Sequence, residues 1–192
     1  KIKIFYPNHL IKLERLYSIK NCSPNYVSWL SNKKINQYLE VRFVKINKKD
    51  IIKNIKKTFN SNTNLLMGIY LRSKSKKKVY EHVGNVKADI NDKHLNAEIS
   101  VIIGESKFHN QGISSKSIYL FSNYLFKKLK IQKLYATVYE KNIYSVKTFQ
   151  SAGYKITNIL KKHRIYKNKR CDEIILSKIK KKWKFVWLDH VT

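Results

Sequence analysis

A glycine-containing turn between an apolar strand and a helix is the first feature of the sequence that could do chemistry. The apolar run ends at Ile102-Ile103-Gly104, and Gly112-Ile113-Ser114 opens a helical pattern that continues to Lys130. The first amide groups of a helix have no internal partner and lie at the positive end of its dipole, so such a turn can bind phosphate. The spacings GxxxxGKS and GxGxxG do not occur here, which leaves an ordinary helix start as the alternative.

The charge balance could also indicate a ligand. The 192 residues contain 41 Lys and Arg against 12 Asp and Glu, which gives a formal net charge of +29. Such a charge favours a polyanionic partner, but Lys, Asn, Ile and Tyr all have AT-rich codons, so compositional bias is an alternative. The basic residues are scattered along the chain rather than gathered in one arm. We therefore do not expect nucleic acid to be the primary partner.

The remaining titratable residues exclude other kinds of site. Cys22 and Cys171 are far apart, and neither has the spacing of a zinc ligand set or a disulfide framework. The histidines show no metal-ligand spacing either, so we expect no metal. No apolar run approaches the length of about 20 residues that a membrane helix needs. The sequence predicts a protein of the reducing cytoplasm, without a targeting signal or a membrane span.

The hydrophobic pattern predicts an α+β protein with a mixed sheet. Alternating or continuous apolar runs predict strands, and apolar residues at a spacing of three and four predict helices. The predicted strands are 2–6, 65–72, 79–90, 97–103, 134–139, 154–160 and 173–179, and the predicted helices are 23–32, 48–60, 112–130 and 142–152. Residues 1–192 are expected to form one domain, with a hairpin loop at 73–78 and a basic aromatic tail at about 180–192.

A second motif follows the turn after one helix and one strand. Asn142, Ser145, Phe149 and Gly153-Tyr154 have the spacing N-x-x-S-x-x-x-[YF]-x-x-x-G-[FY]. Together the turn and this segment resemble the paired signature of the GNAT acetyltransferases. Residues 29–39 resemble the branch that includes ribosomal-protein and amino-sugar N-acetyltransferases. The resemblance covers roughly residues 2 to 180. It implies the GNAT fold, a mostly antiparallel sheet of about six or seven strands flanked by about four helices.

The resemblance implies acetyl-CoA as cosubstrate, with no metal. In the family, a turn resembling Q/R-x-x-G-x-G/A holds the pyrophosphate, and the second motif flanks the pantetheine and thiol. The residues that this implies for coenzyme binding are Val101, Ile102, Ile103, His109, Asn110, Gln111, Gly112, Ile113, Ser114, Ser115, Asn142, Ser145 and Phe149. A backbone amide within Val101–Ile103 is expected to donate to the thioester oxygen. His109 and Ser114 depart from the family's usual residues, but backbone amides can still bind the pyrophosphate.

The implied reaction needs a base, because an alkylammonium with a pKa of about 10 is protonated at neutral pH. Glu98 lies on the strand that faces the acetyl group in the family, so we expect it to act as general base, directly or through a water. Pairing with a lysine or seating of the substrate is the alternative. Glu140 and Glu40 are weaker candidates. Asn142 is expected to bond the coenzyme or a water, and it can also cap a helix. Phe149 stands where a tyrosine often assists departure of the thiolate.

The acceptor is expected to contact Glu40, Arg42 and Phe43, within a stretch that resembles the amino-sugar branch. We expect the acceptor to be a primary amine, and the preferred candidate is a nucleotide-linked amino sugar of surface-polysaccharide biosynthesis. Alternatives are the N-terminus of a ribosomal or other protein, a small amine or antibiotic, and a non-catalytic GNAT-like module that binds a polyanion. The chain could act as a monomer or a homodimer.

Overall fold

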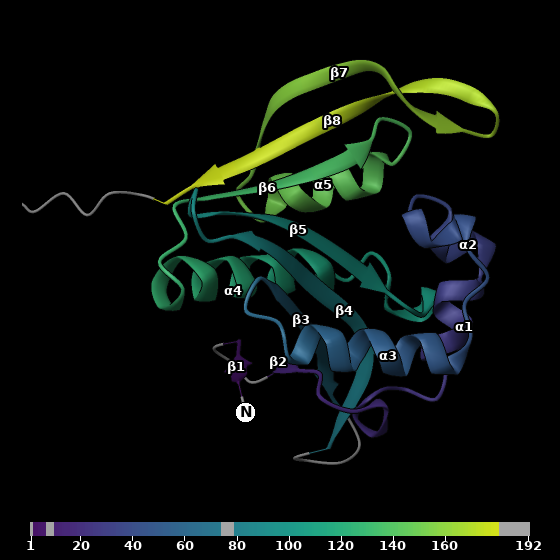
Figure 1. Cartoon of the computed structure of the whole chain (residues 1–192), viewed down its shortest axis with the longest axis vertical. Helices are drawn as coiled ribbons and strands as arrows, with labels where there is room; N and C mark the ends of the chain where they lie inside the picture. Colours follow the sequence, from purple (N-terminus) through teal and green to yellow (C-terminus); the bar gives the residue numbers. More distant parts are fainter. Residues whose placement is uncertain (1, 7–9, 74–78, 181–192) are drawn as a thin grey trace, which may run out of the picture.

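A single twisted sheet organises the chain. The computed structural model describes residues 2–6, 10–73 and 79–180 (Figure 1). Within these residues eight strands form one sheet in the order β1-β2-β3-β4-β5-β6-β8-β7. The strands are β1 (Lys3–Phe5), β2 (Ile11–Arg15), β3 (Asn64–Arg72), β4 (Tyr80–Asn91), β5 (Asn96–Ile103), β6 (Lys133–Tyr139), β7 (Lys155–Tyr166) and β8 (Lys169–Ile179). All neighbours are antiparallel except the parallel pair β5 and β6. This confirms the predicted α+β class.

Helices cover both faces of the sheet (Figure 1). They are α1 (Tyr26–Ser31), α2 (Lys33–Asn36), α3 (Lys48–Phe59), α4 (Ile113–Lys128) and α5 (Ile143–Ser151), with 3-10 turns η1 (Ile19–Asn21), η2 (Glu40–Phe43) and η3 (Ser106–Phe108). Side chains of β3 alternate between two cores: Leu65 and Met67 pack with α4, whereas Leu66 packs with α1 and α3. The sheet is therefore the middle of three layers. No helix within the described ranges has the length and apolarity needed to cross a membrane.

Some element boundaries differ from the prediction. The helix expected from Ser23 begins only at Tyr26, because Ser23 forms a turn whose carbonyl accepts from the Tyr26 amide at 3.0 Å. Strand β2 is not among the predicted strands. Its inward residues Ile11 and Leu13 are fully buried, but three of its five positions carry charge and conceal the short apolar alternation.

The hairpin of β7 and β8 is longer than predicted. The expected strands 154–160 and 173–179 continue toward each other and join at a two-residue turn, Lys167-Asn168, in which both residues have positive φ (49° and 60°). Hairpin turns of this kind usually carry glycine, which this turn lacks. Most β7 side chains are exposed, so no apolar alternation indicates the extension. The predicted hairpin loop falls mostly on residues 74–78 and the aromatic tail on 181–192, both outside the described residues.

The parallel strands β5 and β6 pair over a very short length. Their register runs only from Asn96 opposite Lys133 to Glu98 opposite Tyr135. Beyond this point β5 stays paired with β4 up to Ile103, and β6 stays paired with β8 up to Tyr139. The two strands therefore part, and their facing backbone groups border a wedge that opens through the middle of the sheet.

Candidate functional site

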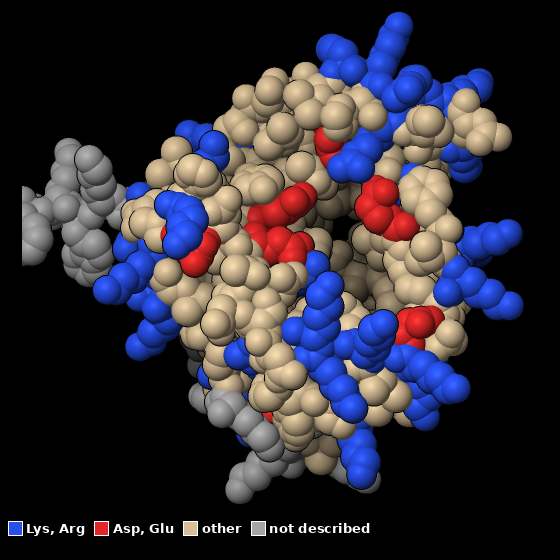
Figure 2. Space-filling view, viewed as in Figure 1, with Lys and Arg blue, Asp and Glu red and all other residues tan. Residues whose placement is uncertain are grey.

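A cavity of about 880 Å³ passes through the wedge. Its lining combines three groups: Tyr26, Leu30, Asp50, Ile51 and Asn54 from α1 and α3; Glu98–Ile102 and Thr137–Tyr139 from the parted strands; and Asn142, Ser145 and Phe149 from α5 and its cap. Since α1 and α3 pack on the opposite face of the sheet from α4 and α5, the cavity connects the two faces. Figure 2 looks into the hollow from the side that Figure 1 shows. Two ligands could therefore meet in it from opposite sides.

Acidic side chains are concentrated around this cavity. Four of the chain's 12 acidic residues line it, against three of its 41 basic residues. The acids are Glu40, Asp50, Glu98 and Glu173, and the bases are Lys45, Lys87 and Arg164. Figure 2 shows acidic side chains at the border of the hollow, while lysines and arginines project from the surrounding surface. The lining therefore has one more acid than base, whereas the chain as a whole is strongly basic.

Glu98 lies where β5 and β6 begin to part. Its carboxylate accepts a hydrogen bond from Thr137 Oγ1 at 2.7 Å, across the start of the wedge. Within the described ranges it has no ion-pair partner, and it lines the cavity. Glu140, by contrast, pairs with Lys141 at 3.4 Å and does not line the cavity. Glu40 also lines the cavity, but it pairs with Arg164 at 3.3 Å, so Glu98 is the candidate base in the lining without an ion-pair partner among the described residues.

Tyr139 and its partners form one wall of the cavity. The Tyr139 hydroxyl donates to Glu40 at 3.0 Å and accepts from Arg42 at 2.8 Å. Burial raises the pKa of this phenol. Arg42 also donates to the Ile165 carbonyl at 3.1 Å. Of the three predicted acceptor residues, only Glu40 lines the cavity. Arg42 is not in the lining but bonds the lining residue Tyr139. Phe43 is 65% exposed and packs against the guanidinium of Arg42.

The tip of the β7–β8 hairpin closes the same wall. Arg164 Nε donates to Glu173 at 2.7 Å, and Arg164 Nη1 reaches Glu40 at 3.3 Å. The ring of Tyr166 stacks on Tyr38 with centroids 4.9 Å apart. Sequence reasoning missed Tyr139, Arg164 and Glu173 as cavity residues. An acid at the inward position of a strand, flanked by Cys171 and Ile175, is the signal that could have indicated Glu173.

The start of α5 brings together three of the predicted coenzyme residues. Asn142 caps the helix by accepting the Ser145 amide at 3.2 Å, and it lines the cavity with Ser145 and Phe149. The neighbouring tyrosines are placed elsewhere. Tyr154 is buried and its hydroxyl lies 2.9 Å from Ser122 Oγ, so burial raises its pKa. Tyr144 is 77% exposed and does not line the cavity.

The predicted phosphate turn lies outside the cavity, at the start of α4. Gly112 is the N-cap residue and has φ of +69°. Because glycine has no side chain, this position supplies no side-chain cap for α4. Asn110 also has positive φ, at 58°. His109 bonds back to the Ile103 carbonyl at 3.2 Å, and Gln111 donates to the Lys107 carbonyl at 2.6 Å. The first amides of α4, those of Ile113, Ser114 and Ser115, are therefore left for an external acceptor. Val101 and Ile102 line the cavity, whereas Ile103 is buried beside it.

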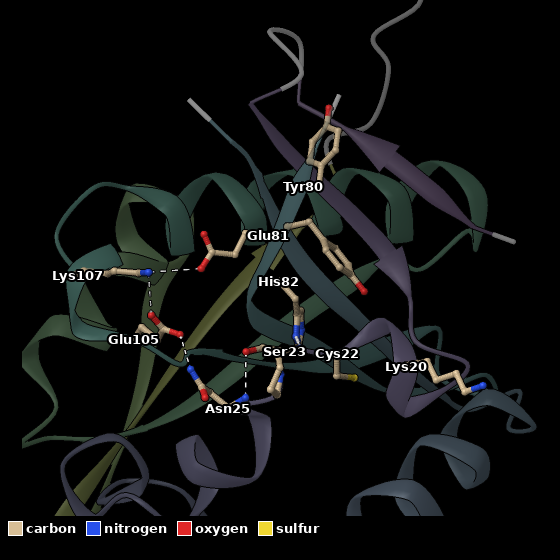
Figure 3. Close-up of a pocket in the computed structure, with 11 residues that line it drawn as sticks. Lys20, Cys22, Ser23, Asn25, Tyr80, Glu81, His82, Glu105 and Lys107 are labelled. Atoms are coloured by element: carbon tan, nitrogen blue, oxygen red, sulfur yellow. Dashed lines mark hydrogen bonds and ion pairs between the residues drawn. The ribbon is translucent and has the colours of Figure 1, made fainter. Parts of the chain in front are cut away.

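Helix α1 is fixed to the sheet by His82 of β4. The Ser23 amide donates to His82 Nδ1 at 2.8 Å, and Figure 3 shows the ring directed at Ser23. Burial lowers the pKa of His82 to about 4. Asn25 donates to Glu105 at 3.2 Å, and Lys107 lies between Glu105 and Glu81 (Figure 3). These contacts hold α1 against the sheet beside the wedge.

Comparisons with known proteins agree with this geometry. Residues 18–155 match the family model described as an acetyltransferase (GNAT) domain. A GNAT-family acetyltransferase from Bacillus anthracis superimposes with a TM-score of 0.76 at 17% identity, covering 93% of this chain and 98% of that one. A spermidine N-acetyltransferase from Vibrio cholerae, in complex with CoA and spermine, gives 0.71 at 17% identity, covering 88% and 95%.

A ribosomal L7/L12 alpha-N-protein acetyltransferase in complex with coenzyme A gives a TM-score of 0.76 at 14% identity, covering 92% of this chain and 97% of that one. No protein of curated function matches the chain by sequence. The solved structures establish the shared fold, and the family model covers most of the chain.

The buried His82 predicts a pH-dependent stability. Its pKa falls from an ordinary value of 6.5 to about 4 on folding, so between these values the unfolded chain binds the extra proton. The free energy of unfolding should therefore decrease as the pH falls from 6.5 to 4, by up to about 3 kcal/mol from this group. Urea unfolding at several pH values measures this decrease in the wild-type chain and in His82→Gln, which lacks the titrating group. Parallel curves for the two proteins would contradict the assignment.

Proposed function

The chain belongs to the GNAT family of acetyl-CoA-dependent N-acetyltransferases, and we propose that it acetylates a primary amine held in the cavity over Glu98. The observation that carries this proposal is the wedge between β5 and β6, which joins the α5 face of the sheet to the acid-lined α1–α3 face. A donor entering from one face and an amine entering from the other would meet there.

The residues on the α4 and α5 side fit acetyl-CoA, which supplies the acetyl thioester when bound. The space at Gly112 is open, because a Cβ added at this glycine would meet no heavy atom closer than 3.8 Å. The uncapped amides that follow Gly112 would hold the pyrophosphate there. Asn142, Ser145 and Phe149 would border the pantetheine arm. Backbone groups of Val101 to Ile103 that face the wedge would donate to the thioester oxygen. His109, Asn110 and Gln111 of the predicted coenzyme set stay predictions, since the side chains of His109 and Gln111 bond to carbonyl groups of the chain.

Glu98 would serve as the base of the reaction. Glu98 takes one proton from the ammonium, directly or through a water, and the freed amine nitrogen then forms a bond to the acetyl carbon. The carbon–sulfur bond breaks, and the second proton of the nitrogen passes to the departing thiolate or to water. Thr137 orients the carboxylate by donating to it at 2.7 Å. A thiolate with a pKa of about 8.5 can leave without a strong acid. The site therefore needs no tyrosine in place of Phe149.

We propose that the acceptor is a nucleotide-linked amino sugar. The lining has one more acid than base, which suits an ammonium group. Exposed Lys45 lines the cavity, and exposed Lys48 and Lys49 begin α3 just before the lining residue Asp50, so these lysines suit a diphosphate. A polyamine would gain from the acids but would be repelled by these lysines. The free cysteines Cys22 and Cys171 support a reducing compartment such as the cytoplasm.

Substitution of Gly112 tests the coenzyme site. Asp and Asn both tolerate the left-handed backbone, so Gly112→Asp and Gly112→Asn differ mainly in charge. We expect the aspartate variant to bind acetyl-CoA at least tenfold more weakly than the asparagine variant, because a carboxylate repels the pyrophosphate. Isothermal titration with acetyl-CoA measures this. Equal affinities would remove the pyrophosphate from this turn.

Substitution of Glu98 tests the base. We expect Glu98→Gln to lower kcat by about a hundredfold, because the amide cannot accept the ammonium proton, while the KM for acetyl-CoA stays unchanged. The assay is release of the CoA thiol with the amine that the wild-type chain acetylates fastest. Glu81→Gln, an equivalent change outside the cavity, is the matched control. Wild-type turnover across the pH range in Glu98→Gln would exclude Glu98 as base.

A further inference from the structure

A β-bulge in β4 places two polar side chains on the acceptor face of the sheet. Tyr70 pairs with His82 and Gly68 pairs with Asn85, so Val83 and Gly84 occupy the space of one residue at the register shift. His82 and Asn85 are three residues apart, yet they share one face because their partners on β3 are two apart. Without the bulge, one of them would point into the other core.

The hydrogen bonds of His82 fix how the Asn85 amide is oriented. Because Nδ1 of His82 accepts from the Ser23 amide at 2.8 Å, Nε2 must carry the ring proton in the neutral form. Nε2 lies 3.0 Å from Asn85 Oδ1 and therefore donates to it. The amide oxygen of Asn85 is thus held against His82. Its Nδ2 must point the other way, and a flipped amide would place two donors against each other.

Asn85 Nδ2 is a donor that lacks a protein acceptor. The residue is only 4% exposed and lines the cavity, and Nδ2 has no hydrogen-bond partner among the described residues. A buried donor without an acceptor is costly. We propose that Asn85 Nδ2 donates to an oxygen of the acceptor substrate and so selects amines that also carry a hydroxyl or carbonyl oxygen. This inference rests on the proposed acetyl transfer.

The position of Asn85 assigns it to the acceptor rather than to the coenzyme. It faces the core that contains α1 and α3, as its hydrogen-bonded neighbour His82 packs on Tyr26 and Trp29 of α1. The cavity residues at the start of α5 lie on the other face. Along the sheet, Asn85 pairs with Ile102, and Glu98 lies four residues earlier on the same strand. An acceptor lying along β5 would therefore meet both side chains.

Substitution of Asn85 by Asp tests this selection. The new side chain keeps an oxygen for His82 but presents a second oxygen in place of Nδ2. Two probe amines are compared: UDP-glucosamine, which has hydroxyl groups beside its amine, and 1,4-diaminobutane, which has no oxygen. We expect Asn85→Asp to raise the KM for UDP-glucosamine about tenfold or more, and not to raise the KM for 1,4-diaminobutane. Asn91→Asp, at the exposed end of the same strand, controls for the added charge.

Other outcomes would overturn the inference. If Asn85→Asp leaves the KM for UDP-glucosamine unchanged, or raises the KM for both amines equally, Asn85 has a structural role only. The same conclusion follows if the wild-type chain acetylates 1,4-diaminobutane but not UDP-glucosamine. If Asn85→Asp does not fold, as judged by its melting curve, the nearly isosteric Asn85→Leu is measured in the same way, with the same expected contrast. A wild-type chain that acetylates neither amine would contradict the proposed amino-sugar acceptor, and the inference with it.

Discussion

The parting of one parallel strand pair is the constraint on which the rest of the site depends. β5 and β6 share a register of three residue pairs and then follow different antiparallel partners, β4 and β8. Because each strand keeps its hydrogen bonds on its outer side, the sheet can open at its centre without losing its two halves. The opening joins two faces that carry different layers of helices. A group-transfer enzyme needs such a meeting point for two ligands that arrive separately.

The second constraint is electrostatic. A chain with 41 basic residues would repel a cationic amine, yet four acids and only three bases line the cavity. Two of them are held by specific partners: Arg164 bonds Glu173 on the neighbouring strand, and Tyr139 bonds Glu40 from a distant part of the chain. Asp50 caps α3 by accepting the Asn47 amide, and Glu98 accepts the hydroxyl of Thr137. The wall carboxylates are thus held in structural contacts, and Glu98 remains available to accept a proton.

The sequence predicts the fold class and the local structure of the two motifs well, because those features depend on local pattern. The αL glycine before α4 and the cap at Asn142 are short-range signals, and both occur at the expected residues. The acceptor wall depends on contacts across 97 to 129 residues, such as those of Arg42 with Tyr139 and Gln37 with Tyr166. No local pattern indicates such contacts. The exposed β7 strand and the bulge that turns Asn85 toward the cavity are equally invisible without the register of the sheet.

Acetyl transfer is tested most directly by CoA thiol release by the full chain from acetyl-CoA, measured with and without amino-sugar nucleotides, peptides and polyamines. We expect slow release without an amine and rapid release with one acceptor class, the amino-sugar nucleotides. Absence of release with every amine, together with thermal stabilisation by RNA but not by acetyl-CoA, would contradict acetyl transfer by this chain. That result would instead describe a non-catalytic module that binds polyanions.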